Sequence, residues 1–101
     1  MARDRLKLQE ELRKFAPKAY FKRPPDNHMT YPCFVYRPSR PSIRRANNKA
    51  YMYVPCYNVL YISREPNEEI GRQMTEYFEY CDYDREYETD NLYHYSFTLY
   101  W

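Results

Sequence analysis

Tyrosine content limits what this chain can fold into more than any other feature of its sequence. Of the 101 residues, 14 are tyrosine, 5 are phenylalanine and one is tryptophan. Disordered chains are poor in aromatic residues, so this composition favours a folded protein. Two interpretations of the tyrosines stay open. Either the tyrosines fill strand positions, where aromatic side chains pack well, or they lie on surfaces that become buried in an assembly. The second interpretation arises because 14 tyrosines are more than we expect one small core to hold.

The length is typical of one domain, and we expect residues 1–101 to form a single domain. A chain of this size buries its core only modestly better than a marginal domain of roughly 60 residues does. Association of several copies would bury further surface, so the length is compatible with an oligomer.

Hydrophobic periodicity predicts two helices and about five strands. The helices are expected over 4–15 and 67–80, and the strands over 19–22, 31–36, 51–62, 82–87 and 92–101. In the first helix, Leu8, Leu12 and Phe15 fall on one stripe, while Asp4 and Asn67 are the expected N-caps of the two helices. The predicted class is α+β, with an antiparallel sheet of four to five strands, both helices on one face, and the order α-β-β-β-α-β-β.

The strand expected over 51–62 has two unlike faces. One face is aliphatic and carries Met52, Val54, Cys56, Leu60 and Ile62. The other face carries the tyrosines Tyr51, Tyr53, Tyr57 and Tyr61. We expect the aliphatic face to meet the helices and the tyrosine face to meet solvent or a partner subunit. Pro55 cannot donate to a strand ladder, so it predicts a bulge or an edge.

Charge is unevenly distributed along the chain, although the formal net charge is only +2. That value is too small to indicate nucleic-acid binding by itself. The segment 37–49 carries only basic charges, namely Arg37, Arg40, Arg44, Arg45 and Lys49, and the segment 65–90 carries most of the acids. One basic and one acidic region predict head-to-tail pairing between copies. The segment 38–49 is expected to be a loop of about twelve residues, a length that is often functional.

The carboxylates of the acidic region alternate with other residues along the expected strand. They are Asp82, Asp84, Glu86 and Glu88. Strict alternation places them on one face, where such a group could bind a hard cation. We favour the other interpretation, in which this face is solvated or matches basic groups on a neighbouring subunit. Asp82, Asp84 and Glu86 are therefore candidate interface residues together with the four tyrosines.

Motifs of the common enzyme sites are missing from the sequence. It contains no GxSxG, P-loop or dinucleotide fingerprint, and its single glycine cannot form a glycine-rich phosphate cradle. His28 lies in a proline-rich segment. His94 lies on the polar face of the last strand, and we expect it to be exposed, although Asp90 could pair with it. We therefore expect no catalytic residue, no metal site and no cofactor, and we predict that the chain is not an enzyme.

The cysteines and the apolar segments indicate the compartment. Cys33, Cys56 and Cys81 are widely spaced and lack zinc-ligand spacing, so we expect buried free thiols in a reducing compartment. No segment reaches the roughly 20 apolar residues that a membrane helix needs. The first fifteen residues are charged rather than apolar, unlike a signal peptide. We expect assembly in the cytoplasm and no membrane contact.

A small nucleic-acid-binding module is the alternative function. A basic loop beside tyrosine-rich strands is typical of sheet surfaces that stack bases. Two features oppose this interpretation. Acids are interleaved with the aromatic residues in the last third of the chain, and an RNP-type motif needs glycine among its aromatics.

Several short runs, taken in order, carry a resemblance to a known group of proteins. The runs are AYFKRPP at 19–25, YPCFVY at 31–36, ANNK at 46–49 followed by Tyr51, YNV at 57–59, REP at 64–66, DNLYH at 90–94 and FTLY at 97–100. They resemble the small proteins of the head–tail module of long-tailed bacteriophages, of the tail-terminator or tail-completion type.

This resemblance implies a tail-terminator-like fold and a structural virion protein at the head-proximal end of the tail. Subunits would form a hexameric ring on the tail tube protein, stop its polymerisation and dock the head–tail connector protein. Arg40, Arg44, Arg45 and Lys49 would then contact a neighbouring subunit or the lumen. In the lumen they could meet the phosphates of passing DNA without sequence specificity.

Overall fold

The computed structural model describes residues 5–24, 28–39, 42–46 and 49–101, and for the strands between 42 and 54 it describes the backbone. Two helices and seven strands lie in these ranges. In chain order they are α1 (Arg5–Leu12), β1 (Lys18–Phe21), β2 (Cys33–Pro38), β3 (Ser42–Ala46), β4 (Lys49–Val54), β5 (Cys56–Ser63), α2 (Ile70–Tyr77), β6 (Cys81–Thr89) and β7 (Leu92–Tyr100).

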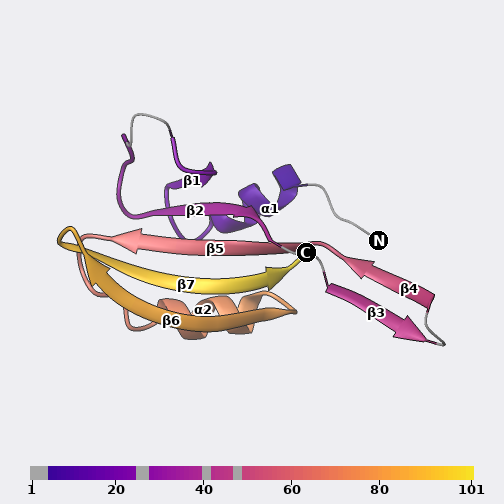
Figure 1. Ribbon diagram of the computed structural model, residues 1–101. Coiled ribbons are helices and arrows are strands. Elements are labelled where there is room, and N and C mark those ends of the chain that lie inside the picture. The colour runs from indigo at the N-terminus through magenta and orange to yellow at the C-terminus, as the bar shows by residue number, and fades with distance from the viewer. Residues whose placement is uncertain (1–4, 25–27, 40–41, 47–48) are drawn as a thin grey trace.

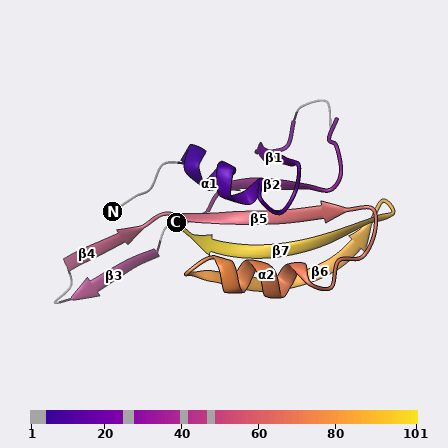
Figure 2. The ribbon, with the colours of Figure 1, turned by 180° about the vertical axis from the view of Figure 1, so that it is seen from behind.

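Five of the strands form one sheet in the order β1-β2-β5-β7-β6. The pairs β2–β5, β5–β7 and β6–β7 are antiparallel, and only β1 runs parallel to its neighbour β2. Figures 1 and 2 show both helices on the same face of this sheet. The predicted α+β class, the mostly antiparallel sheet and the order α-β-β-β-α-β-β of its elements are confirmed.

Pro55 divides the single strand that was expected over 51–62. Proline lacks the N–H that would continue the ladder, so β4 ends at Val54 and β5 begins at Cys56. The Pro55 carbonyl instead accepts a hydrogen bond from the Trp101 N–H at 3.0 Å. On the other side of this break, β4 pairs antiparallel with β3 in a separate two-stranded sheet. The prediction of a loop over 38–49 is therefore wrong.

The core lies between the helices and the tyrosine-rich face of the sheet. The leucines and methionine of the helices meet the aromatic side chains of the three central strands in one cluster. Its buried members include Leu8, Leu12, Ile70, Met74, Phe34, Tyr36, Val59, Tyr61, Tyr95, Phe97 and Leu99. The expected orientation of β5 is therefore wrong, because Tyr61 faces the helices while Leu60 and Ile62 belong to a second cluster on the opposite face.

Hydrogen bonds to the helices explain how tyrosine can occupy these buried positions. The Tyr36 hydroxyl donates to Gln9 Oε1 at 2.7 Å, and Arg5 donates to that hydroxyl at 3.3 Å. Before α2, Asn67 donates from its backbone to the Tyr95 hydroxyl at 2.8 Å and from its side chain to the Tyr61 hydroxyl at 3.3 Å. A buried hydroxyl without a partner costs free energy. Among the described residues, no buried side-chain nitrogen or oxygen lacks one.

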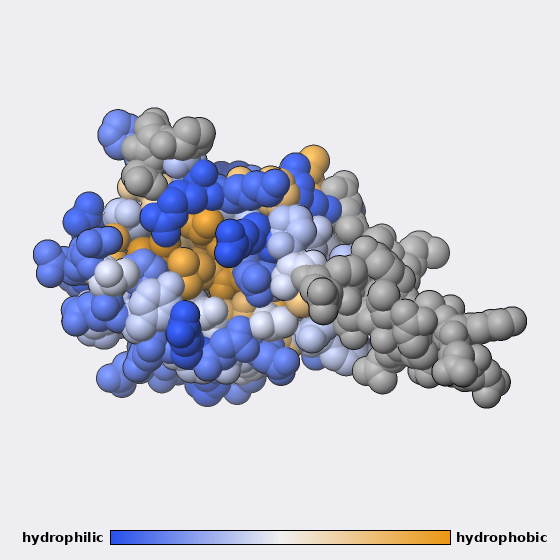
Figure 3. Space-filling model, in the orientation of Figure 1, coloured by the Kyte–Doolittle hydropathy of each residue, from blue (hydrophilic) through white to orange (hydrophobic). Residues whose placement is uncertain are grey.

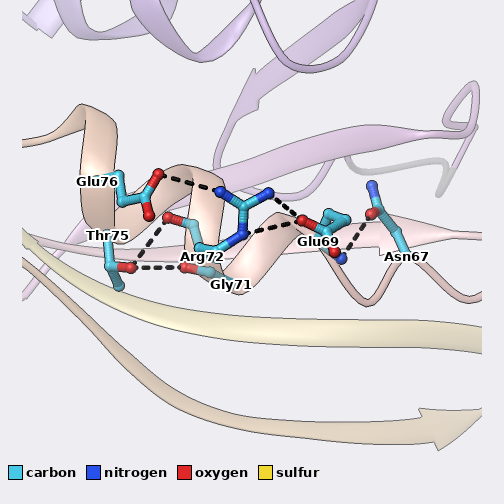
Figure 4. A network of polar contacts seen from close by, with 6 residues as sticks. All are labelled: Asn67, Glu69, Gly71, Arg72, Thr75 and Glu76. Atoms are coloured by element: carbon cyan, nitrogen blue, oxygen red, sulfur yellow. Dashed lines mark hydrogen bonds and ion pairs between the residues drawn. The ribbon is translucent and has the colours of Figure 1, made fainter.

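Of the stripe predicted for the first helix, Leu8 and Leu12 are fully buried, whereas Phe15 follows the end of α1 and packs against the same core while partly exposed. The expected N-cap Asp4 lies outside the described residues. In α2 the N-cap is Glu69 rather than Asn67, and the Asn67 carboxamide oxygen accepts the Glu69 N–H at 3.2 Å (Figure 4). Figure 4 also shows Arg72 bound to Glu69 and Glu76. These ion pairs are exposed, so each contributes less than about 1 kcal/mol.

Gly71 lies where α2 touches the sheet. A Cβ atom built at this position would be 2.9 Å from the ring of Tyr83 on β6. That ring stacks on Phe97, with 5.2 Å between the ring centroids, so it is held from its other side. Gly71 therefore lies at a close contact between α2 and the sheet, where a larger side chain would meet the Tyr83 ring.

Replacing Gly71 by alanine should therefore destabilise the protein by about 1 kcal/mol. Overpacking costs about 1–3 kcal/mol, which exceeds the gain of about 1 kcal/mol in helix propensity. In a Tyr83→Ala background the same replacement should become stabilising, because the ring is gone. Urea unfolding of the four proteins measures both effects. A stabilising Gly71→Ala in the wild-type background would contradict the argument.

Candidate functional site

The hairpin of β3 and β4, called the arm below, stands apart from the rest of the fold. Its two strands pair from Ser42–Val54 to Ala46–Lys49, with a bulge between Arg44 and Arg45, and with no strand of the five-stranded sheet. Figures 1 and 2 show the arm pointing away from one end of that sheet, and the molecule extends 49 × 27 × 23 Å. An isolated two-stranded hairpin is marginally stable in water at best. The arm is therefore a candidate partner-binding element.

The basic residues predicted to contact a neighbour or a lumen fall on this arm. Arg44 and Arg45 lie in β3, and Lys49 is the first residue of β4. Arg40 lies outside the described residues. The segment was expected to be a loop, but in the structure Ser42–Ala46 and Lys49–Val54 are the two paired strands of a hairpin.

The four tyrosines predicted to form one interface are separated by the break at Pro55. Tyr51 and Tyr53 belong to β4 and therefore to the arm. Tyr57 and Tyr61 belong to β5, where they face the helices. Tyr61 is only 4% exposed, and the half-buried Tyr57 packs on Tyr36 with their ring centroids 6.0 Å apart. The structure therefore places the four tyrosines on two strands of two different sheets.

Strand β6 forms the second candidate surface. It is the last strand of the sheet and, within the part of the chain that the structure describes, it pairs with β7 alone, so no described strand lies beside its other edge. All its residues from Asp82 to Thr89 are exposed. The predicted interface residues Asp82, Asp84 and Glu86 therefore lie on a solvent-exposed edge strand.

A register shift in β6 divides its carboxylates between two faces. The shift lies between Tyr83 and Arg85, so the alternation of side chains changes by one position there. Asp82 stands opposite Thr98, and the Thr98 hydroxyl donates to Asp84 at 2.7 Å, which places both acids on the face away from the helices. Glu86 and Glu88 stand opposite Tyr95 and Tyr93, on the helix side. The prediction that the four acids share one face is therefore wrong.

The face of the sheet away from the helices holds a hollow. Figure 3 shows apolar side chains gathered in the middle of this face with polar residues around them. At the end where β5 finishes and β7 begins there is a cavity of about 270 Å³. Its lining is Arg23, Met29, Tyr31, Ile62, Tyr87, Thr89, Asp90, Leu92 and His94. Sequence analysis did not find this group, because its members come from four separate segments.

His94 is the titratable group at the bottom of this hollow. It was expected to be exposed, but it is only 5% exposed, so that expectation is wrong. Its ring stacks on Tyr87 with 4.8 Å between centroids and 7° between planes, and its Nδ1 lies 3.1 Å from the Leu92 carbonyl oxygen. Burial lowers the pKa of His94 below its ordinary value, and the nearby Arg23 lowers it further. The Asp90-Asn91 turn could have revealed the stack, because it sets Tyr87 opposite His94.

The three thiols are free, and their surroundings make them poor nucleophiles. Cys33 and Cys56 are buried and Cys81 is half-buried. Burial raises the pKa of Cys33 to about 11 and that of Cys81 to about 12, so both stay protonated near neutral pH. Within the described residues no group of three or more His, Cys, Asp or Glu side chains could hold a metal ion. In the same part of the chain no helix is long and apolar enough to span a bilayer.

Comparisons with models of protein families, with curated proteins and with solved structures find no match for this chain.

Acidification should destabilise the fold through His94. Because burial lowers its pKa in the folded state, the unfolded chain binds the proton more tightly. Stability is then full above the ordinary histidine pKa near 6.5 and falls as the pH drops below it. A His94→Phe variant, which keeps a ring against Tyr87, should lose less stability between pH 7.5 and pH 5.5 than the wild type does.

Denaturant unfolding at several pH values measures this difference. A Tyr87→Phe variant, which keeps His94 and the ring against it, is the matched control and should keep the pH dependence of the wild type. The argument is refuted if His94→Phe shows the same loss of stability on acidification as the wild type.

Proposed function

We propose that this chain is a non-enzymatic structural subunit that assembles with other copies into a ring. The observation that carries the proposal is the arm, which pairs with no strand of its own sheet. A hairpin of this kind gains stability when a partner covers it, because two strands alone bury too little apolar surface. Size supports the same conclusion, since a chain of 101 residues buries only one small core.

The place of this ring in a larger particle rests on the sequence resemblance. We propose a subunit of the tail-terminator or tail-completion type at the head-proximal end of a phage tail. Such a ring would cap the tail tube protein and join it to the head–tail connector protein. The basic arm would contact a neighbouring subunit or face the lumen, where phosphates of passing DNA would meet it without sequence readout.

A nucleic-acid-binding module fits the geometry less well. Base-stacking sheets present aromatic side chains from their central strands to solvent. Here the aromatics of the central strands β2, β5 and β7 face the helices, where Phe34, Tyr61 and Phe97 are buried. The exposed edge strand β6 is mainly acidic, which repels a phosphate backbone. The basic character that this alternative needs is left to the arm and to the α1–β1 segment, where Lys7, Lys18 and Lys22 are exposed.

Removing the arm should abolish assembly without unfolding the subunit. Replacing residues 40–54 by Asn-Gly leaves Asn-Gly-Pro55 between Ser39 and Cys56, whose backbones are already joined by a hydrogen bond of 2.7 Å. A short connection containing glycine suits such a hairpin. The melting temperature measured on the monomeric fraction should stay within about 4 °C, which corresponds to less than about 1 kcal/mol.

Size-exclusion chromatography with light scattering, over a range of protein and salt concentrations, compares the two proteins. We expect a discrete oligomer for the wild type and a monomer for the shortened chain. Electron micrographs of purified tail tubes with added protein test the placement, and density at one end of each tube is expected. A wild-type chain that stays monomeric and binds oligonucleotides with a steep salt dependence would favour the alternative function.

A further inference from the structure

We infer that the free edge of β6 in one copy is the docking site for the arm of the next copy. This inference rests on the proposed function, because it names the two surfaces that would join the subunits. Both surfaces are described by the structure: the arm, Ser42–Ala46 with Lys49–Val54, and the edge strand Cys81–Thr89.

The backbone provides the first argument. Strand β6 has nine residues, and its outer edge carries N–H and C=O groups with no strand beside them. Each arm strand also has one free edge, because β3 and β4 pair only with each other. Addition of a strand to an exposed sheet edge is a common mode of recognition, in which main-chain hydrogen bonds supply affinity. The β6 edge is long enough to pair with all five residues of β3 or all six of β4.

Charge provides the second argument. Strand β6 carries four acids, Asp82, Asp84, Glu86 and Glu88, and one base, Arg85. The arm strands carry Arg44, Arg45 and Lys49 and no acid. Like charges on facing strands repel and opposite charges attract. Two β6 strands would therefore repel each other, two arms would do the same, and an arm beside β6 is the complementary pair.

The division of the acids by the register shift strengthens this complementarity. Asp82 and Asp84 lie on the uncovered face of the sheet, while Glu86 and Glu88 lie on the helix side. Consecutive residues of a strand also point to opposite faces. A basic strand added to this edge would therefore have acidic neighbours on both faces of the sheet. Charged residues on an edge strand usually prevent pairing, and here they restrict pairing to a basic strand.

The placement of the two surfaces makes the contact head to tail. Figure 1 shows the arm extending beyond one end of the sheet, whereas β6 runs along its side. The arm pairs with none of the five sheet strands, its own β6 included. A contact between two different surfaces of identical subunits closes into a ring when the rotation between copies permits it.

Charge reversal tests the docking site. The β6 variant is Glu86→Lys with Glu88→Lys, both at exposed positions, and the arm variant is Arg44→Glu with Arg45→Glu. Each variant alone should be monomeric, with an apparent dissociation constant raised at least tenfold. An equimolar mixture should assemble again, because the reversed arm matches the reversed β6 and each unchanged surface matches its unchanged partner.

The matched control reverses two exposed acids away from both surfaces. Glu10→Lys with Glu65→Lys makes the same change in net charge as the β6 variant. Its oligomeric state by light scattering should equal that of the wild type. Circular dichroism and melting curves on every protein show whether the sheet is intact. A β6 variant that unfolds is replaced by the neutral pair Glu86→Gln with Glu88→Gln, which should also weaken assembly.

The possible outcomes separate this inference from the proposed function. A wild-type oligomer that the β6 variant also forms overturns the docking site and leaves the assembling subunit intact. Loss of assembly in both variants without recovery in the mixture also overturns it, because the arm would then bind elsewhere. A wild-type chain that is monomeric at every concentration contradicts the proposed function itself.

Discussion

The fold depends on buried tyrosines whose hydroxyl groups are held by the helices. Tyr36 is bound from α1 by Gln9 and Arg5, and Tyr61 and Tyr95 are bound by Asn67 just before α2. Each ring supplies apolar surface to the core, and each hydroxyl needs a partner there. These bonds therefore help to set where both helices lie on the sheet. They also show that these three of the 14 tyrosines belong to the core rather than to a partner surface.

The sequence predicts the class and order of the fold because those depend on local patterns. The stripe of Leu8 and Leu12 and the Asp90-Asn91 turn between β6 and β7 are each visible within a few residues. The orientation of β5 is different, because hydropathy favours burial of Leu60 and Ile62 on the helix side. On the helix side Asn67 supplies a hydrogen-bond partner for the Tyr61 hydroxyl, which local hydropathy does not reveal.

The candidate site shows the same contrast between features that are visible in local sequence and features that depend on the folded chain. Sequence analysis finds the basic and acidic segments, since charge is visible directly, and it also finds the break at Pro55. It misses the shape of each segment. The shift between Tyr83 and Arg85 separates acids that strict alternation would group, and no residue type there signals it. The burial of His94 depends on Arg23, Met29 and Tyr31 from a distant segment, which line the same hollow.

Pro55 separates the core of the fold from the arm that we propose for assembly. Without a donor at this position the ladder of β5 stops, so β4 leaves the sheet and pairs with β3 instead. The Pro55 carbonyl remains bound to the Trp101 N–H, which anchors the base of the arm to the end of the chain. The core therefore closes without the arm, and the arm is left with free edges of its own. Under the proposed docking, substitutions in the arm and at the β6 edge change partner binding while the tyrosine-bonded core keeps its stability.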